Sequence, residues 1–183
     1  MRQLWGYIRR NGSWLLLPKF EEANVFHKGY AAVKSEGKWG IINKRGQFVI
    51  DNDYEYMLNM SDGLFAAKLN GKWGYLNINS QFKIRPLFDS ARSFQNGLAV
   101  VEKNGKMGVI DKTGKFTITP KYDALFNFSN NLAAAQLNRK WGYINTEGEW
   151  AIAPTYQAAY PFSEGLGRIK KDGKFGYLTP EGE

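Results

Sequence analysis

Few residues of this chain have the types and spacing that catalytic or metal chemistry requires. His27 is the only histidine and there is no cysteine, so the sequence supports neither a His-rich metal site nor a His-based catalytic triad. Asp51, Asp53 and Glu55 alternate like the start of a calcium loop, but Tyr56 stands where that loop needs glycine. No phosphate-binding glycine loop is present. We therefore predict that the protein is not an enzyme, with no catalytic residue, metal or cofactor.

A recurring lysine could form a basic row. It stands at the same position of five successive segments, as Lys38, Lys72, Lys106, Lys140 and Lys174. With a net charge of +8, such a row could track a polyanion or a nucleic acid. The alternative, which we favour, is that the lysines blunt sheet edges or pair with recurring acids. These acids are Glu21, Glu55, Asp89 and Asp123. We therefore do not expect a nucleic acid as the partner.

The lysines belong to a repeat of fixed length. An aromatic or Met residue followed by Gly recurs at 5, 39, 73, 107, 141 and 175, so every gap is 34 residues. The sequence predicts a single repeat array over residues 1–183, in which neighbouring units bury each other's apolar faces. The predicted units are 5–38, 39–72, 73–106, 107–140 and 141–174, with a partial unit at 175–183.

Each unit has the pattern of three antiparallel strands. The first starts at the Trp-Gly pair, as in Trp39 to Asn43, and is followed by a turn that ends in Gly. The second alternates apolar and polar residues and is expected to end near a proline. The third has a Gly-Leu-Ala-x-Val pattern, as in Leu64 to Lys68, and leads through Asn-Gly into the next unit. Ser80 and Arg139 stand where Gly is expected, which predicts backbone strain there.

The glycine of the Trp-Gly pair and the recurring aromatics have structural interpretations. A glycine inside a strand often marks the close approach of another group, and we expect a ring or the backbone of an adjacent repeat there. Trp39 and Tyr75 could stack bases or sugars. Because the same aromatic positions recur in every repeat, we expect them in the core instead.

The connection between the second and third strands varies most from repeat to repeat. A binding partner that recognises one repeat would contact the residues that differ. Its contact-prone residues are Tyr56, Arg92, Phe126 and Tyr160, and Tyr and Arg are typical interface anchors. These four residues are our candidate partner-binding residues. The alternative is that they pack the connection down onto the sheets.

Composition fits a packed β-protein, with 43% hydrophobic and 15% aromatic residues. We expect an all-β fold in which the meanders stack as an open, twisted array, with a closed propeller-like ring as the alternative. No apolar signal region precedes the first repeat and no run of 18 apolar residues occurs, so we expect no membrane insertion. The localisation is unknown, and a cytoplasmic one is favoured. The end of the sequence at a turn suggests a piece of a longer repeat protein.

The pattern Gly-Lys-Trp-Gly-Tyr-Ile-Asn, followed by Ile-x-Pro-x-Tyr-Asp and Gly-Leu-Ala-x-Val, resembles the bacterial WG repeat family, also called KWG repeats. The resemblance implies β-rich binding modules and no catalytic residue. We therefore expect a non-enzymatic, basic scaffold that mediates protein–protein interaction. The alternatives are a cell-envelope or glycan-binding module that uses exposed aromatics, and polyanion binding through the lysines.

Overall fold

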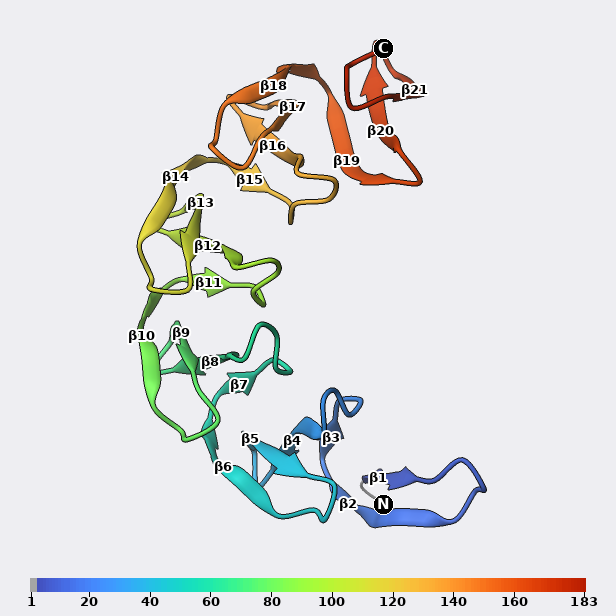
Figure 1. Cartoon of the computed structure of the whole chain (residues 1–183), viewed down its shortest axis with the longest axis vertical. Helices are drawn as coiled ribbons and strands as arrows, with labels where there is room; N and C mark the ends of the chain where they lie inside the picture. The colour runs from blue at the N-terminus through green and yellow to red at the C-terminus, as the bar shows by residue number, and fades with distance from the viewer. Residues whose placement is uncertain (1–2) are drawn as a thin grey trace. The chain divides into compact units, whose positions relative to one another are not determined.

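The computed structural model describes residues 3–183, which form strands and turns and no helix (Figure 1). The predicted all-β fold is therefore confirmed. Among the described residues no helix is long and apolar enough to span a membrane. The expectation that no signal region precedes the first repeat includes Met1 and Arg2, which lie outside the described residues. The chain divides into two compact units, one ending at Phe94 and the other beginning at Gln95.

The first unit holds a hairpin followed by two antiparallel sheets of four strands. The hairpin joins β1 (Trp5–Ile8) and β2 (Trp14–Phe20). The first sheet is β3 (Glu22–Ala23), β4 (Tyr30–Ser35), β5 (Lys38–Asn43) and β6 (Phe48–Tyr54), in that order. The second is β7 (Tyr56–Met57), β8 (Phe65–Leu69), β9 (Lys72–Leu76) and β10 (Phe82–Phe88), again in chain order. The short β11 (Ser90–Ala91) follows.

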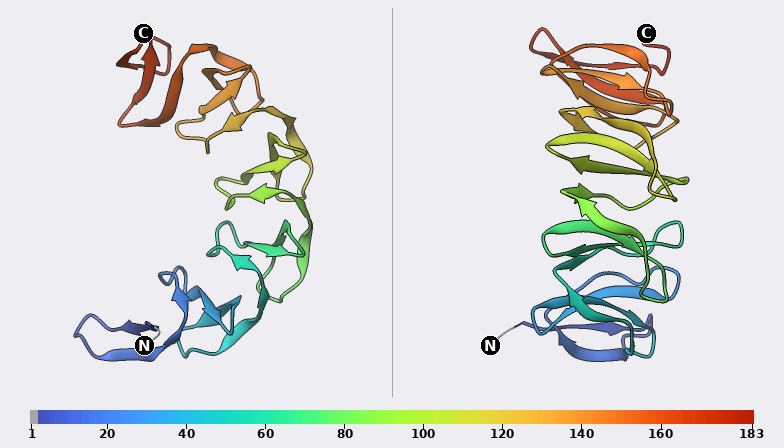
Figure 2. Two further views of the ribbon diagram at one scale, coloured as in Figure 1. Left: turned by 180° about the vertical axis from the view of Figure 1, so that it is seen from behind. Right: turned by 90° about the vertical axis from the view of Figure 1, so that its left-hand side faces the viewer.

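The second unit continues the same scheme (Figure 2). It starts with β12 (Leu98–Lys103), β13 (Lys106–Asp111) and β14 (Phe116–Tyr122). The next sheet has the order β15 (Ala124–Leu125), β16 (Ala133–Leu137), β17 (Lys140–Ile144) and β18 (Trp150–Tyr156). The last is β19 (Ala158–Ser163), β20 (Leu166–Lys171) and β21 (Lys174–Leu178). Each of these sheets keeps two edge strands.

The sequence predicted three strands per repeat, and the structure adds a fourth, usually of two residues. This strand follows the recurring acid and lies beside the third strand, as where Glu22 pairs with Lys34 and Ala23 with Val33. The prediction of a three-stranded meander was therefore incomplete. Two residues are too few for an alternating pattern to be recognised in the sequence.

The turns between strands have the predicted chemistry. Asn70 and Gly71 between β8 and β9 have φ angles of 51° and 76°, as a type I′ hairpin turn requires. Ser80 and Arg139, at φ 60° and 63°, occupy the left-handed region in place of glycine, which confirms the conformation on which the predicted strain depends. At the other end of the sheet, the side-chain oxygen of Asn77 accepts hydrogen bonds from two backbone N–H groups of its turn.

The glycine of each Trp-Gly pair lies under the backbone of the second strand of its own repeat. Trp73 pairs with Phe88 and Tyr75 with Ile84. An advance of two residues along β9 therefore corresponds to four residues along β10, which is a bulge in β10. A Cβ on Gly74 would lie 2.6 Å from the carbonyl oxygen of Ile84. Our expectation that an adjacent repeat approaches this glycine was wrong, because the widened second strand of the same repeat fills the space.

The prolines lie inside the second strands rather than at their ends. Pro86 belongs to β10, which continues to Phe88. The nitrogen of Pro86 lies 2.7 Å from a Cβ placed on Gly74, so the proline sits in the bulged segment over that glycine. The prediction that the strand ends near the proline was therefore wrong, since a bulge interrupts the ladder and tolerates a residue without an N–H group.

Each inner sheet is buried on both faces by its neighbours within the unit. In β4, Ala31 and Val33 pack with Phe20 of the hairpin, whereas Ala32 between them packs with Phe65 of the following sheet. The second unit has two such layers, one around Val109 and Ile144 and one around Tyr143 and Ile169. Small residues in the third strand let two sheets approach it at once. Trp39 and Tyr75 are 2% and 1% exposed, which confirms the predicted core role.

We predict that Gly74→Ala lowers the free energy of unfolding by about 3 kcal/mol, because the backbone of Ile84 and Pro86 must move to admit the methyl group. Gly176→Ala is the matched control, since β21 has no second strand over it. There the nearest atom to a Cβ is Ile169 Cδ1, at an ordinary 3.7 Å. Denaturant unfolding midpoints test the pair, and equal shifts in both variants would contradict the assigned role of the glycine.

Candidate binding surface

The recurring acids connect the short strand to the type I′ turn beside it. Glu55 accepts a hydrogen bond from the backbone N–H of Gly71 at 2.9 Å, and Asp123 accepts one from the N–H of Asn138 at 2.9 Å. Gln157, which replaces the acid in the last full repeat, accepts one from the N–H of Gly173 at 2.8 Å. These acids therefore have a structural role that the sequence analysis did not anticipate.

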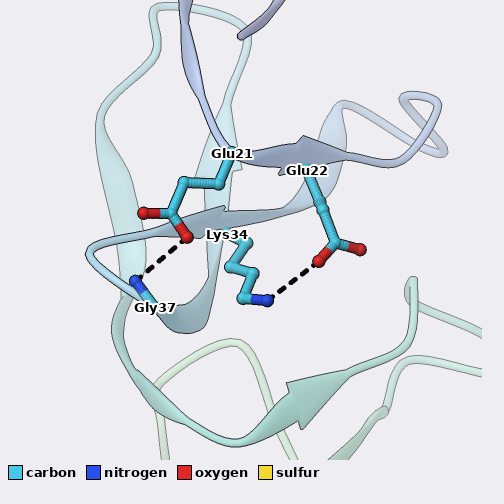
Figure 3. A network of polar contacts seen from close by, with 4 residues as sticks. All are labelled: Glu21, Glu22, Lys34 and Gly37. Carbon is cyan, nitrogen blue, oxygen red and sulfur yellow. Dashed lines mark hydrogen bonds and ion pairs between the residues drawn. The ribbon is translucent and has the colours of Figure 1, made fainter. Parts of the chain in front are cut away.

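Ion pairs neutralise part of the lysine row. Lys72 pairs with Asp89 and Lys106 with Asp123, as the favoured alternative predicted. The hydrogen bond from Lys106 is the largest cause that lowers the pKa of Asp123. Figure 3 shows an ion pair of another lysine, beside the turn between β4 and β5 of the first four-stranded sheet. There Lys34 Nζ lies 2.9 Å from Glu22 Oε1. Beside them, Glu21 accepts a hydrogen bond from the N–H of Gly37 at 3.2 Å.

Three aromatic rings form a ladder on the first unit. The ring of Tyr56 lies 4.8 Å from that of Trp39 and 5.8 Å from that of Trp73, measured between centroids. Tyr56 is 39% exposed, whereas Trp39 beneath it is buried. In the sheet, Lys68 pairs with both Tyr56 and Trp73, and its Nζ lies 3.9 Å from Glu55 Oε2. We call Tyr56, Trp73, Lys68 and Glu55 the Tyr56 patch.

The other predicted partner-binding residues are half-buried, with Arg92 and Phe126 on connections and Tyr160 inside β19. Arg92 is in the first unit, and burial lowers the pKa of its guanidinium. Phe126 and Tyr160 are in the second unit. The ring of Phe126 packs 5.6 Å from that of Trp141, and the Arg168 guanidinium lies 4.0 Å from the centre of the Tyr160 ring. Of these four residues, Tyr56 alone is exposed.

Tyrosines of the Trp-Gly strand anchor these connections. The hydroxyls of Tyr75 and Tyr143 donate to the backbone carbonyls of Arg92 and Tyr160, at 2.7 and 2.8 Å. Tyr7 donates in the same way to the carbonyl of Asn24, at 2.8 Å. The sequence carried a signal for this role, because Tyr follows Trp-Gly in alternate repeats, but the acceptor is a backbone atom that no side-chain pattern marks.

The residues considered for metal chemistry do not converge. His27 is exposed, as are Asp51, Asp53 and Glu55. Among residues 3–183, no group of three or more His, Asp or Glu side chains is placed to hold a metal ion.

The repeat pattern is that of a known family. The family model described as WG containing repeat matches residues 5–39, 39–73, 73–106, 107–141 and 141–175. No curated protein sequence is significantly similar to the chain.

Solved structures share the fold at low sequence identity. Hsv2 of Kluyveromyces lactis has a TM-score of 0.59 and 13% identity, over 90% of this chain and 63% of that one. The extracellular domain of a putative hybrid two-component system from B. thetaiotaomicron has a TM-score of 0.52 and 12% identity, over 86% of this chain and 27% of that one. The chain thus spans less than two thirds of the length of either. These folds are β-propeller-like, and at such identities the likeness concerns the fold alone.

We predict that the protein loses stability as the pH rises above 10. Burial raises the pKa of Tyr7 and of Tyr143 to about 12, whereas a tyrosine in the unfolded chain ionises near pH 10. Between these values the unfolded state binds fewer protons, so unfolding becomes more favourable as the pH rises. Denaturant midpoints from pH 8 to pH 11.5 measure the effect. Tyr143→Phe should make the decline shallower, whereas Tyr177→Phe, at an exposed residue, should not; equal slopes in all three proteins would contradict this assignment.

Proposed function

Because the chain belongs to the family of WG-containing repeat proteins, we propose that it is a non-enzymatic module that binds a protein partner through the Tyr56 patch. The single observation that carries the proposal is the exposure of Tyr56. Its ring is held in place by Trp39 and Trp73, yet 39% of the residue faces solvent. A preorganised aromatic residue gives up little conformational entropy on binding, and Tyr and Trp are the commonest hot-spot residues of protein interfaces.

The surroundings of Tyr56 support a protein partner. Lys68 and Glu55 lie beside Tyr56 and form a pair of opposite charges, and Lys72, which precedes Trp73 of the patch, pairs with Asp89. An aromatic centre with a rim of both charges is typical of protein interfaces. Polyanion binding calls for lysines that are not already paired with carboxylates, so these pairs weigh against that alternative.

The position of Tyr56 in the repeat also supports partner recognition. The equivalent residues in the other repeats are Glu22, Ser90, Ala124 and Ala158. None of these is aromatic, so the fold does not require a ring at this position. The ring of Tyr56 therefore distinguishes one repeat from the others, as a partner-specific contact would.

We predict that Tyr56→Ser and Lys68→Glu reduce affinity for a protein partner by tenfold or more, since removing an interface hot spot costs about 2 kcal/mol or more. The measurement is quantitative affinity capture with the full chain as bait, followed by titration of the captured protein against each variant. Lys44→Glu is the matched control, because Lys44 is an exposed lysine of a turn that lies outside the patch.

Tyr56→Ser uncovers Trp39, so its folding is checked by the unfolding midpoint and by tryptophan emission, and Tyr56→Phe should retain binding. A partner that binds all four variants as tightly as the parent chain would overturn the proposal. So would capture of a glycan rather than a protein by the parent chain.

A further inference from the structure

The second unit contains a small cavity with an apolar floor and a polar rim. Its volume is about 110 Å³. The floor is formed by Leu98, Val100, Val109 and Phe128, and the rim by Gln95, Asn96, Asn127, Asn131 and Thr146. Val100 and Val109 are buried, whereas several rim residues are exposed, so the cavity opens towards solvent on its polar side. An apolar cavity of about 150 Å³ in another protein holds one benzene molecule, so this smaller, open cavity has room for at most one small ring.

The cavity lies where other repeats place a tyrosine ring. Val109 is equivalent to Tyr7, Tyr75 and Tyr143, the residues after Trp-Gly in alternate repeats. Each of these tyrosines packs against a phenylalanine of the segment that follows the second strand of its repeat. The centroid distances are 4.6 Å for Tyr7 and Phe26, 4.6 Å for Tyr75 and Phe94, and 4.8 Å for Tyr143 and Phe162.

Phe128 is the equivalent phenylalanine for Val109, and it lines the cavity. In the tyrosine-containing repeats the phenol also donates its hydroxyl hydrogen to the backbone of the connection, as Tyr75 does to the carbonyl of Arg92. The space beside Val109 therefore has the outline of a phenol side chain: a ring against Phe128 and a hydroxyl directed towards the polar connection.

The other repeat without this tyrosine fills the space differently. Ile41 takes the place of Val109 in the first unit, and there Tyr30 and Ile78 stand where the second unit has Leu98 and Thr146. Tyr30 and Ile78 both pack against the core cluster that contains Ile41. Three larger side chains thus replace three smaller ones at equivalent positions, which accounts for the difference in filling.

We propose that the cavity beside Val109 is a binding site for a small phenol, that is, a single aromatic ring that carries a hydroxyl group. The ring packs on Phe128 between Leu98 and Val109, in the manner of the tyrosine rings of the other repeats. The hydroxyl meets the amide and hydroxyl groups of the rim, which fix its orientation. A mostly apolar pocket with a few convergent polar groups is the usual form of a small-molecule site.

The test is a titration of the full chain with phenol, monitored through the NMR chemical shifts of the backbone amides. Saturable shifts of the signals of residues around Val109, with a dissociation constant of about 1 mM, are expected for a ligand of this size. Benzene lacks the hydroxyl and cyclohexanol lacks the flat ring, so each should bind at least threefold more weakly. Absence of saturation by 10 mM phenol, or equal binding of cyclohexanol, would overturn the proposal.

Val109→Tyr places a covalent phenol in the cavity and should abolish phenol binding while raising the thermal unfolding midpoint. Leu98→Tyr, which reproduces Tyr30, is a second filling variant and should also abolish binding. Ile41→Tyr is the matched control: it adds the same ring where the space is already filled, so it should lower the midpoint and leave phenol binding unchanged. Phenol binding that persists in both folded filling variants would show that the ligand binds elsewhere and would overturn the proposal.

Discussion

The contact on which the structure depends is that between the glycine of each Trp-Gly pair and the backbone of the strand that follows it. A side chain on Gly74 would collide with the carbonyl of Ile84, so glycine alone allows the second strand to cross so closely. The extra residues of the second strand are accommodated over this glycine, and the ladder resumes where Trp73 meets Phe88. The bulge bends the strand as it leaves the sheet. The next short strand, β11, then begins at Ser90, two residues after Phe88.

Once the second strand passes to the next sheet, each inner sheet is enclosed between two neighbours. The third strand lies in the middle of this arrangement, which explains why Ala31, Ala32 and Val33 are all buried although they point alternately to opposite faces. The last sheet shows the converse. Arg168 stands at the position of these small residues and is exposed, and its guanidinium covers Tyr160 instead. The need for small side chains is therefore a consequence of having a neighbour on each face.

The sequence predicted the features that recur at a fixed offset. The 34-residue period, the three longer strands, the type I′ turns and the buried positions of Trp39 and Tyr75 all follow from patterns that several repeats share. The features that it missed depend on backbone atoms or on very short segments. A two-residue strand shows no alternation, and the partner of Gly74 is a carbonyl, whose position no residue type reports. The position of Pro86 was misjudged for the same reason, because a bulge is a property of two paired strands.

The candidate sites were harder to predict because they depend on differences between repeats rather than on repetition. Tyr56 was recognised by its residue type, yet the position of its ring depends on contacts with Trp39 and Trp73, which belong to two successive sheets. The cavity is a stronger example. The cavity exists because Leu98 in β12, Val109 in β13 and Thr146 after β17 are smaller than the equivalent residues of the first unit. These three positions meet only in the folded unit. In a repeat protein the shared residues maintain the stack. Both proposed sites therefore lie where one repeat departs from the others, at a ring that the fold does not need and at a ring that it lacks.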